Sequence, residues 1–244
     1  MMADIATIIW KEFAELFMQR GRFRGGLVGM LIFVGVFGVV MPLQTGREWV
    51  ETPAGLIFFL WLPYLLVSGV TADTFAGERE RHTLETLLAS RLSDRAILFG
   101  KLGATILYGW GLTLLNMALG LTTVNLAFGK GEFLMFPPDL FVGVLVLSLL
   151  VAGFGATLGT VVSLRAATVR QASQILSVVM LVVFIPLLLL PLIPPDWQAQ
   201  AIQTLLAMDI RQVGLWAMAI LLTLDVGLLV FAMQQFQRAK LILD

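Results

Sequence analysis

Few side chains in this sequence could perform catalytic chemistry. The chain has no cysteine and a single histidine, His82, so it can form neither a thiolate nucleophile nor a Cys/His metal cluster. The HExxH motif of zinc hydrolases, the GxSxG motif of serine hydrolases and the GxxxxGKS/T phosphate loop are also missing from the sequence. We therefore predict that the chain is not an enzyme, and that it binds no metal ion or cofactor itself.

One carboxylate of the sequence lies within a long apolar stretch, where a charged group is energetically unfavourable. Asp225 is the only ionisable residue near the middle of a long apolar stretch, and an acid inside a bilayer suggests ion or proton transfer. The structural alternative is a protonated or hydrogen-bonded acid that joins two helices, for example through Asn116. Asp225 and Asn116 are therefore the intramembrane polar candidates, and both interpretations remain open from the sequence.

A second group of polar residues lies in the segment 78–89, between two apolar stretches. Its charges alternate over residues 78–81 and keep the segment out of a bilayer. Thr83 can cap a short helix whose first turn holds Glu85, and Ser93 marks the start of the next helix. Three leucines form a small apolar face on the short helix: Leu84, Leu87 and Leu88. The segment is predicted to be a capped helix that exposes leucines and charges to the cytoplasm; the alternative is a solvated connector.

The composition indicates a membrane protein. Hydrophobic residues make up 59% of the 244 residues and charged residues 13%, with a mean hydropathy of +0.92, whereas a soluble domain is about a quarter charged. The apolar residues form blocks of the length that a spanning helix needs, roughly 20 residues, without the short alternating segments of a membrane β-barrel. The predicted fold is all-α and polytopic. The net charge of zero does not suggest a nucleic-acid partner.

Six transmembrane helices are predicted within a single domain over residues 1–244. They fall at about residues 26–43, 54–73, 97–127, 139–163, 172–193 and 213–234. The third is long enough to be tilted or to project from the bilayer, and the fifth is expected to bend or break because it holds Pro186 and Pro191. Residues 196–212 form an amphipathic stretch that we expect at the outer surface. Small residues in the fourth span predict close helix packing: Ala152, Gly155, Ala156 and Gly159.

Residues 3–20 have the periodicity of an amphipathic helix. Because this helix leads directly into the first span, we expect it to lie in the membrane interface, with packing on a soluble partner as the alternative. The three arginines that follow it are typical of contact with anionic lipid headgroups: Arg20, Arg22 and Arg24.

The distribution of basic residues predicts the orientation. Of the 16 lysines and arginines, only Arg47, Lys130 and Arg211 fall on the side opposite the N-terminus when the six spans are drawn. Lysine and arginine are enriched in cytoplasmic loops. Both termini are therefore predicted to be cytoplasmic, and the protein to be a multi-pass protein of the cytoplasmic (inner) membrane.

The segment 78–101 resembles the cytoplasmic loop of ABC type-2 permeases, the membrane subunits of a class of ATP-driven exporters. The residues that carry the resemblance are Glu78-Arg79-Glu80, Thr83-Leu84-Glu85, Leu87-Leu88, Ser93 and Gly100-Lys101. The amphipathic N-terminal helix, the six spans and the interrupted fifth span also resemble this family, so the likeness extends over nearly the whole chain. Two residues depart from the family's pattern: His82 replaces a common glycine, and Leu92 a common proline.

The resemblance implies a permease subunit that couples ATP hydrolysis by a separate ATPase subunit to substrate translocation, as an exporter. In this family the N-terminal helix and the loop form the ATPase docking surface, here Glu78, Arg79, Glu80, Thr83, Leu84, Glu85, Leu87 and Leu88. ATP and Mg²⁺ would be bound by the partner, and two permeases, identical or related, would pair with two ATPases. The alternative is a secondary transporter that uses Asp225; a membrane-embedded enzyme fits less well because no catalytic motif occurs.

Overall fold

The computed structural model describes all residues except 19–22, 190–193, 195, 198–199, 201–208 and 237–244. The described residues form helices and no strand, which confirms the all-α prediction. In chain order the helices are α1 (Met2–Met18), α2 (Phe23–Gly35), η1 (Val36–Val40), α3 (Met41–Thr45), α4 (Glu48–Glu51), α5 (Pro53–Thr74), α6 (Ala76–Glu80), α7 (Leu84–Leu88), α8 (Asp94–Phe128), α9 (Pro138–Arg165), α10 (Val169–Leu189) and α12 (Ile210–Gln235).

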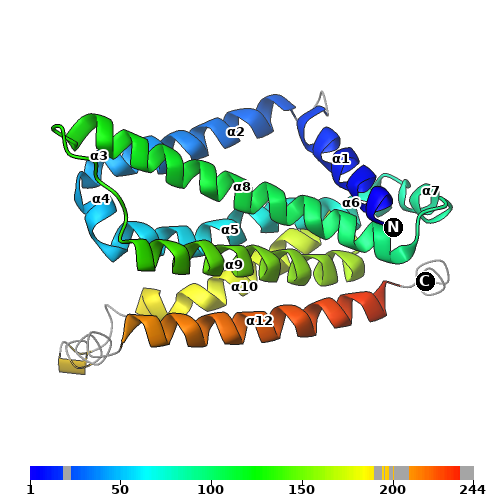
Figure 1. Ribbon diagram of the computed structural model, residues 1–244. Coiled ribbons are helices and arrows are strands. Elements are labelled where there is room, and N and C mark those ends of the chain that lie inside the picture. Colours follow the sequence, from blue (N-terminus) through cyan, green and yellow to red (C-terminus); the bar gives the residue numbers. More distant parts are fainter. Residues whose placement is uncertain (19–22, 190–193, 195, 198–199, 201–208, 237–244) are drawn as a thin grey trace.

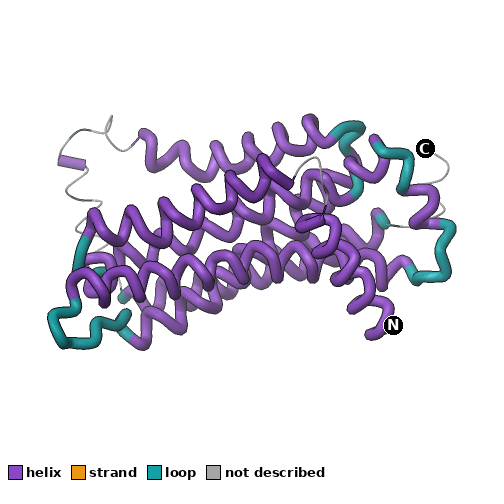
Figure 2. Tube along the Cα trace, turned by 90° about the horizontal axis from the view of Figure 1, so that it is seen from above, coloured by secondary structure: helices purple, strands orange, loops and turns teal. Residues whose placement is uncertain are grey.

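The long helices form an elongated bundle. Figure 1 shows α5, α8, α9 and α12 running along its length, with α1, α6 and α7 gathered at one end and α3 and α4 at the other. Figure 2 places the loops at the same two ends. We call these the α1 end and the α4 end. α9 lies at the centre, where it packs on α5, α8 and α12.

Five helical stretches of the described chain are long and apolar enough to cross a bilayer: Val28–Thr45, Phe58–Glu80, Asp94–Phe128, Pro138–Arg165 and Arg211–Gln235. They match five of the six predicted spans and confirm the polytopic fold. The predicted span 172–193 corresponds to α10, whose described apolar part, Val169–Val182, is shorter. α10 continues through Pro186 to Leu189, while Pro191 and most of the predicted surface stretch 196–212 lie outside the described residues.

The first span contains a turn of π-helix. α2, η1 and α3 follow one another without interruption, and η1 is a single wide turn within this run. Gly38 in this turn lies so close to α8 that a Cβ on it would be 3.0 Å from the Cβ of Leu119. The Thr123 hydroxyl donates a hydrogen bond to the Gly38 carbonyl over 3.1 Å. The glycine thus lets the first span approach α8 closely.

The contact between α5 and α9 depends on small residues. A Cβ on Gly155 would lie 3.2 Å from the Tyr64 ring, and a Cβ on Gly159 would overlap the side chain of Thr71. The two alanines of the same predicted stripe are fully buried. The close packing predicted for the fourth span is therefore confirmed. The Tyr64 hydroxyl also donates to the Leu176 carbonyl over 3.0 Å, which ties α10 to this pair of helices.

Candidate functional site

The predicted docking segment lies at the α1 end, where α5 gives way to α6. The Ser163 hydroxyl of α9 accepts hydrogen bonds from the backbone N–H groups of Phe75 (3.1 Å) and Ala76 (2.9 Å), and it donates one to the Ala72 carbonyl (3.1 Å). It thereby satisfies backbone groups that are left without helical partners where the two helices meet. α6 is therefore a direct, anchored continuation of α5.

A buried lysine joins four helices at this end. Lys101 of α8 is 2% exposed, and its ammonium donates hydrogen bonds to Glu12 of α1 (2.8 Å), to Glu78 of α6 (2.9 Å) and to the Thr74 carbonyl of α5 (3.0 Å). The ammonium also lies 5.3 Å from the centroid of the Phe75 ring, within cation–π range. Since a buried charge is tolerated only when it is paired, these contacts hold the four helices in fixed relative positions.

A second ammonium lies on the solvent side of the same group. Lys11 pairs with Glu15 (3.0 Å), Glu78 (3.2 Å) and Glu12 (3.3 Å). Burial alone would lower the pKa of Lys11, but the neighbouring carboxylates outweigh burial and raise the pKa above its ordinary value. Burial alone would raise the pKa of Glu12, and the ammoniums of Lys101 and Lys11 lower it instead. We call Lys11, Glu12, Glu15, Glu78 and Lys101 the charge cluster; its three carboxylates and two ammoniums carry one net negative charge.

Glu78 is placed differently from the sequence prediction. It is 3% exposed, so it lies inside the charge cluster and not on an exposed docking surface. Its Oε1 accepts hydrogen bonds from both Lys11 and Lys101, whereas its Oε2 is buried and has no hydrogen-bond partner among the described residues. The alternating charges of the segment could not reveal this burial, because it depends on α1, 67 residues away at Lys11.

A glycine lets α1 reach the charge cluster. A Cβ on Gly100 would lie 2.6 Å from the Cβ of Ile8, and Ile8 is 2% exposed at this contact. A Cβ on Gly103, one turn further along α8, would lie 3.2 Å from Ile9. Packing therefore explains the Gly100-Lys101 pair. The glycine allows α1 to pack closely on α8, and the adjacent lysine binds the acids that α1 and α6 carry.

Arg79 and Glu80 bind the turn between α9 and α10. The Arg79 guanidinium donates to the carbonyls of Leu164 (2.9 Å) and Ala166, and Glu80 accepts from the backbone N–H of Val169 over 2.9 Å. Both side chains thus satisfy backbone groups at helix ends. The Arg79 guanidinium is engaged within the chain and is half-buried, and Glu80 is exposed; that both charges face a partner stays a prediction.

The turn between α6 and α7 differs from the sequence prediction. Thr83 was expected to cap α7, but its side chain makes no cap bond; its φ and ψ are −98° and −12° instead of the extended values that a cap requires. Its hydroxyl donates to the Glu78 carbonyl over 3.3 Å.

His82 has a φ of 56°, a left-handed conformation that glycine adopts most easily. The resembled loop commonly has glycine at this position. Ser93 caps α8 as predicted, accepting from the backbone N–H of Ala96 (3.2 Å).

Leu84 and Leu87 of α7 face the protein interior. Leu84 is 7% exposed and belongs to the same buried cluster as Phe75, and Leu87 packs against that cluster while partly buried. The side chain of Leu88 lies outside the described part. The prediction that this apolar face is exposed is therefore wrong for Leu84: the face holds α7 on the bundle, because helices elsewhere in the chain supply the surface that covers it.

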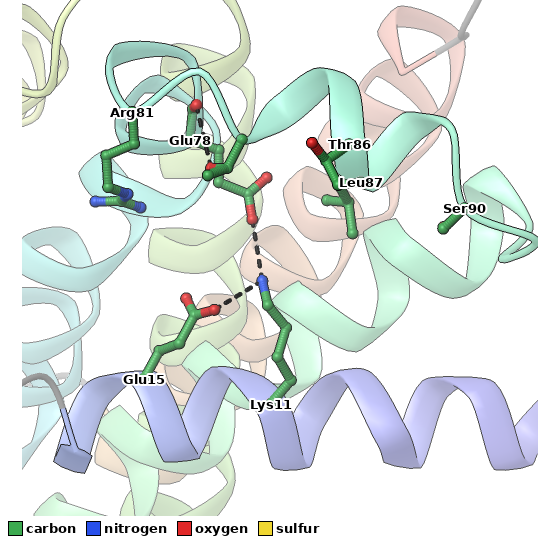
Figure 3. Close-up of a pocket in the computed structure, with 8 residues that line it drawn as sticks. Lys11, Glu15, Glu78, Arg81, Thr86, Leu87 and Ser90 are labelled. Carbon is green, nitrogen blue, oxygen red and sulfur yellow. Dashed lines mark hydrogen bonds and ion pairs between the residues drawn. The ribbon is translucent and has the colours of Figure 1, made fainter.

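A pocket of about 480 Å³ opens between α1 and α7. The residues that line it are Lys11, Glu15, Glu78, Arg81, Thr83, Thr86, Leu87 and Ser90. Figure 3 shows Lys11 reaching from α1 toward Glu78, with Glu15 beside it and the α7 residues Thr86 and Leu87 across the opening. The pocket thus combines carboxylates on one side with hydroxyl groups and an apolar wall on the other. Such a site suits a side chain that donates several hydrogen bonds.

The two intramembrane polar candidates make separate contacts. Asp225 of α12 faces α9, where a Cβ on Gly153 would lie 3.0 Å from its carboxylate; its Oδ1 is buried and has no hydrogen-bond partner among the described residues. Asn116 of α8 is fully buried and donates to the Leu112 carbonyl over 2.8 Å, and its oxygen lies near Gly38 of the first span. The suggested bridge between Asp225 and Asn116 is not among the contacts of the described chain.

A comparison with known protein families finds a match over most of this chain. The family described as "ABC-2 family transporter protein" matches residues 5–208, which include most of α1, the segment 78–89 and all of α8. The chain belongs to the ABC-2 transporter family. A comparison with curated proteins finds no match. The ABC-2 permease is therefore the membrane subunit of an ABC transporter, a multi-pass protein of a family that associates with an ATPase subunit.

Four residues of the charge cluster are absent from the site predicted from the sequence: Lys11, Glu12, Glu15 and Lys101. Lys101 has a visible signal, because the Gly100-Lys101 pair is part of the resemblance to ABC-2 permeases. Lys11, Glu12 and Glu15 have none, since they lie on the polar face of an amphipathic helix, where charges usually meet water. Their role becomes visible only when α1 is packed on α8.

Proposed function

We propose that this ABC-2 permease couples ATP hydrolysis by a separate cytoplasmic ATPase subunit to substrate export, and that the ATPase docks on the α1 end. The observation that carries the proposal is the charge cluster, in which Lys101 binds α1 and α6 to the first turns of α8. Family membership supports the pairing with an ATPase. ATP and Mg²⁺ are bound by that partner, and this chain holds no cofactor.

Energy coupling needs a stiff connection between the docking face and the spans. α6 follows α5 directly, and α8 runs from Asp94 beside the docking face to Phe128 at the other end. Leu84 anchors α7 in the core, and burial of such a side chain contributes roughly 1.5–3 kcal/mol. A displacement of α7 is therefore passed to α5 and α8 and is not absorbed by a loose loop.

The basic residues support a cytoplasmic α1 end. The described loops and helix ends there carry several of them: Arg79, Arg81, Arg91, Arg95, Arg165 and Arg170. The α4 end carries Arg47, Lys130 and Arg211. By the positive-inside rule both termini are then cytoplasmic, and the protein lies in the cytoplasmic (inner) membrane.

Two outer helical stretches offer apolar surface to lipid and to a second permease. In the apolar 18-residue windows of Val28–Thr45 and Arg211–Gln235, only 11% and 6% of the residues are buried in the chain. Large apolar surfaces of this kind are covered by lipid or by another subunit. We expect a second permease copy, identical or related, to cover part of this surface about a two-fold axis.

A charge reversal on the exposed face of α7 tests the docking proposal. Glu85 is exposed in the first turn of α7, so Glu85→Arg changes the docking face without entering the core. We expect most of the ATPase to be lost on co-purification, together with most ATP-dependent transport by the reconstituted complex. The permease itself should still insert and fold.

Glu48→Arg is the matched control, because Glu48 is an exposed glutamate in the first turn of a short helix at the opposite end. This variant should keep both the ATPase and transport. If Glu85→Arg and Thr86→Arg both bind the ATPase and transport normally, the α1 end is not the docking face.

A further inference from the structure

We propose that the pocket between α1 and α7 receives an arginine side chain of the ATPase subunit, whose guanidinium donates to Oε2 of Glu78. The proposal rests on the proposed function, because it names the partner chemistry of the same docking face. Four observations carry it: an unsatisfied buried acceptor, an unbalanced charge, the lining of the pocket and its size.

The acceptor is a buried carboxylate oxygen without a donor. Oε1 of Glu78 accepts from Lys101 at 2.9 Å and from Lys11 at 3.2 Å. Oε2 of the same carboxylate accepts no hydrogen bond from the described residues, although Glu78 is 3% exposed. A buried polar atom that has lost its water without gaining a partner destabilises the state in which it is buried. A donor brought by the ATPase removes this penalty only in the complex.

The charge cluster also has one more negative than positive charge among the described residues. Glu12, Glu15 and Glu78 face the ammoniums of Lys11 and Lys101, which leaves one negative charge over among the described residues. Arg81 is the remaining cation of the pocket lining, and its guanidinium is paired with Asp73 through contacts of 3.1 and 3.2 Å. One incoming cation therefore balances the charge cluster.

The lining of the pocket favours a guanidinium over an ammonium. The residues that line the pocket include two acids, Glu15 and Glu78, beside the paired cations Lys11 and Arg81, and Leu87 adds an apolar wall. A guanidinium has five N–H donors in one plane and an apolar stem that packs along such a wall, whereas an ammonium is a compact charge with three donors. The volume of about 480 Å³ is within the range of small-ligand pockets, about 300–1,000 Å³, and accommodates one long side chain with water.

A photo-crosslinking amino acid at Thr86 identifies the occupant in the assembled complex. We expect the crosslinked peptide to come from the ATPase and to contain an arginine within a few residues of the attachment point. A peptide from the permease itself, or an ATPase peptide without an arginine, would overturn the proposal.

Binding measurements then test the acceptor. Glu78→Gln keeps the shape of the side chain and an oxygen for the two lysines, but removes the charge that the guanidinium needs. We expect the ATPase to bind this variant about 30-fold more weakly or worse, the usual consequence of losing one partner of a buried charge pair. Replacement of the crosslinked arginine by alanine should weaken binding to a similar degree and add little in the double variant.

Glu12→Gln reports the purely structural effect, because Glu12 belongs to the charge cluster but does not line the pocket. The loss in Glu78→Gln must exceed the loss in Glu12→Gln by about tenfold; equal losses would mean that Glu78 acts only through the fold. The two proposals also fail differently. If the docking face lies elsewhere, Glu85→Arg has no effect and Thr86 crosslinks no ATPase. If only the pocket is wrongly assigned, Glu85→Arg still detaches the ATPase while Glu78→Gln binds it as tightly as the parent.

Discussion

At the scale of single residues, the buried polar groups of this permease differ in whether they have hydrogen-bond partners. The ammonium of Lys101 has three acceptors within 3.0 Å, whereas Oδ1 of Asp225 is buried with no partner among the described residues. Lys101 therefore acts as a structural link. Asp225 is the residue on which an ion-coupled mechanism would depend, and membership of the ABC-2 family does not favour that mechanism.

Loss of the Lys101 ammonium should destabilise the fold strongly. Lys101→Met keeps the length of the side chain but leaves Glu78 and Glu12 with only one ammonium between them, so we expect a loss of about 3–5 kcal/mol, the usual cost of breaking a buried ion pair. Lys11→Met should cost less, because the Lys11 side chain is 40% exposed. Chemical denaturation in detergent measures both values. Equal stability of Lys101→Met and the parent would contradict the structural role of the charge cluster.

At the scale of elements, the proposed docking face depends on the contact between α1 and α8. α1 carries Glu12, which pairs with Lys101, and it approaches α8 most closely at Gly100, where Ile8 occupies the space that a side chain would fill. α7 depends on the same end of the bundle, since Leu84 packs in the cluster that contains Ile8. Separation of α1 from α8 should therefore remove the docking face while the spans stay packed.

Gly100→Val tests the contact between α1 and α8. The new side chain would overlap Ile8, so we expect overpacking to cost about 1–3 kcal/mol and α1 to become sensitive to protease, with loss of the ATPase on co-purification. Gly111→Val on the same helix is the control, because a Cβ there meets nothing within 4 Å. Combining Gly100→Val with Ile8→Ala should restore part of the binding. If Gly100→Val behaves like Gly111→Val, α1 does not depend on this contact.

The whole molecule has two chemically different ends. The α1 end combines the charge cluster, the pocket and most of the basic residues of the described loops, and the α4 end holds the short connections around α4 and after α8. A transporter that is driven from one side of the membrane needs such an asymmetry, because its ATPase must meet only one face.

The orientation of the two ends can be measured directly, because the chain has no cysteine. Single cysteines at Thr52 and Gly131, at the α4 end, should react with an impermeant thiol reagent added to intact cells. Cysteines at Ser90 and Ala167, at the α1 end, should react only after the membrane is opened. Labelling of Ser90→Cys from outside intact cells would reverse the proposed topology.

The sequence by itself determined the features that depend on local composition. Long apolar blocks must become helices in lipid, so the all-α fold and five of the spans follow from it, and the Ser93 cap and the small residues of the fourth span are equally local signals. The tertiary structure alone decided that Glu78 is buried, that Leu84 faces inward and that Lys101 binds Glu12, 89 residues away. A charge has the same appearance in a sequence whether water or a distant helix surrounds it, and only the packing of α1 on α8 makes that difference.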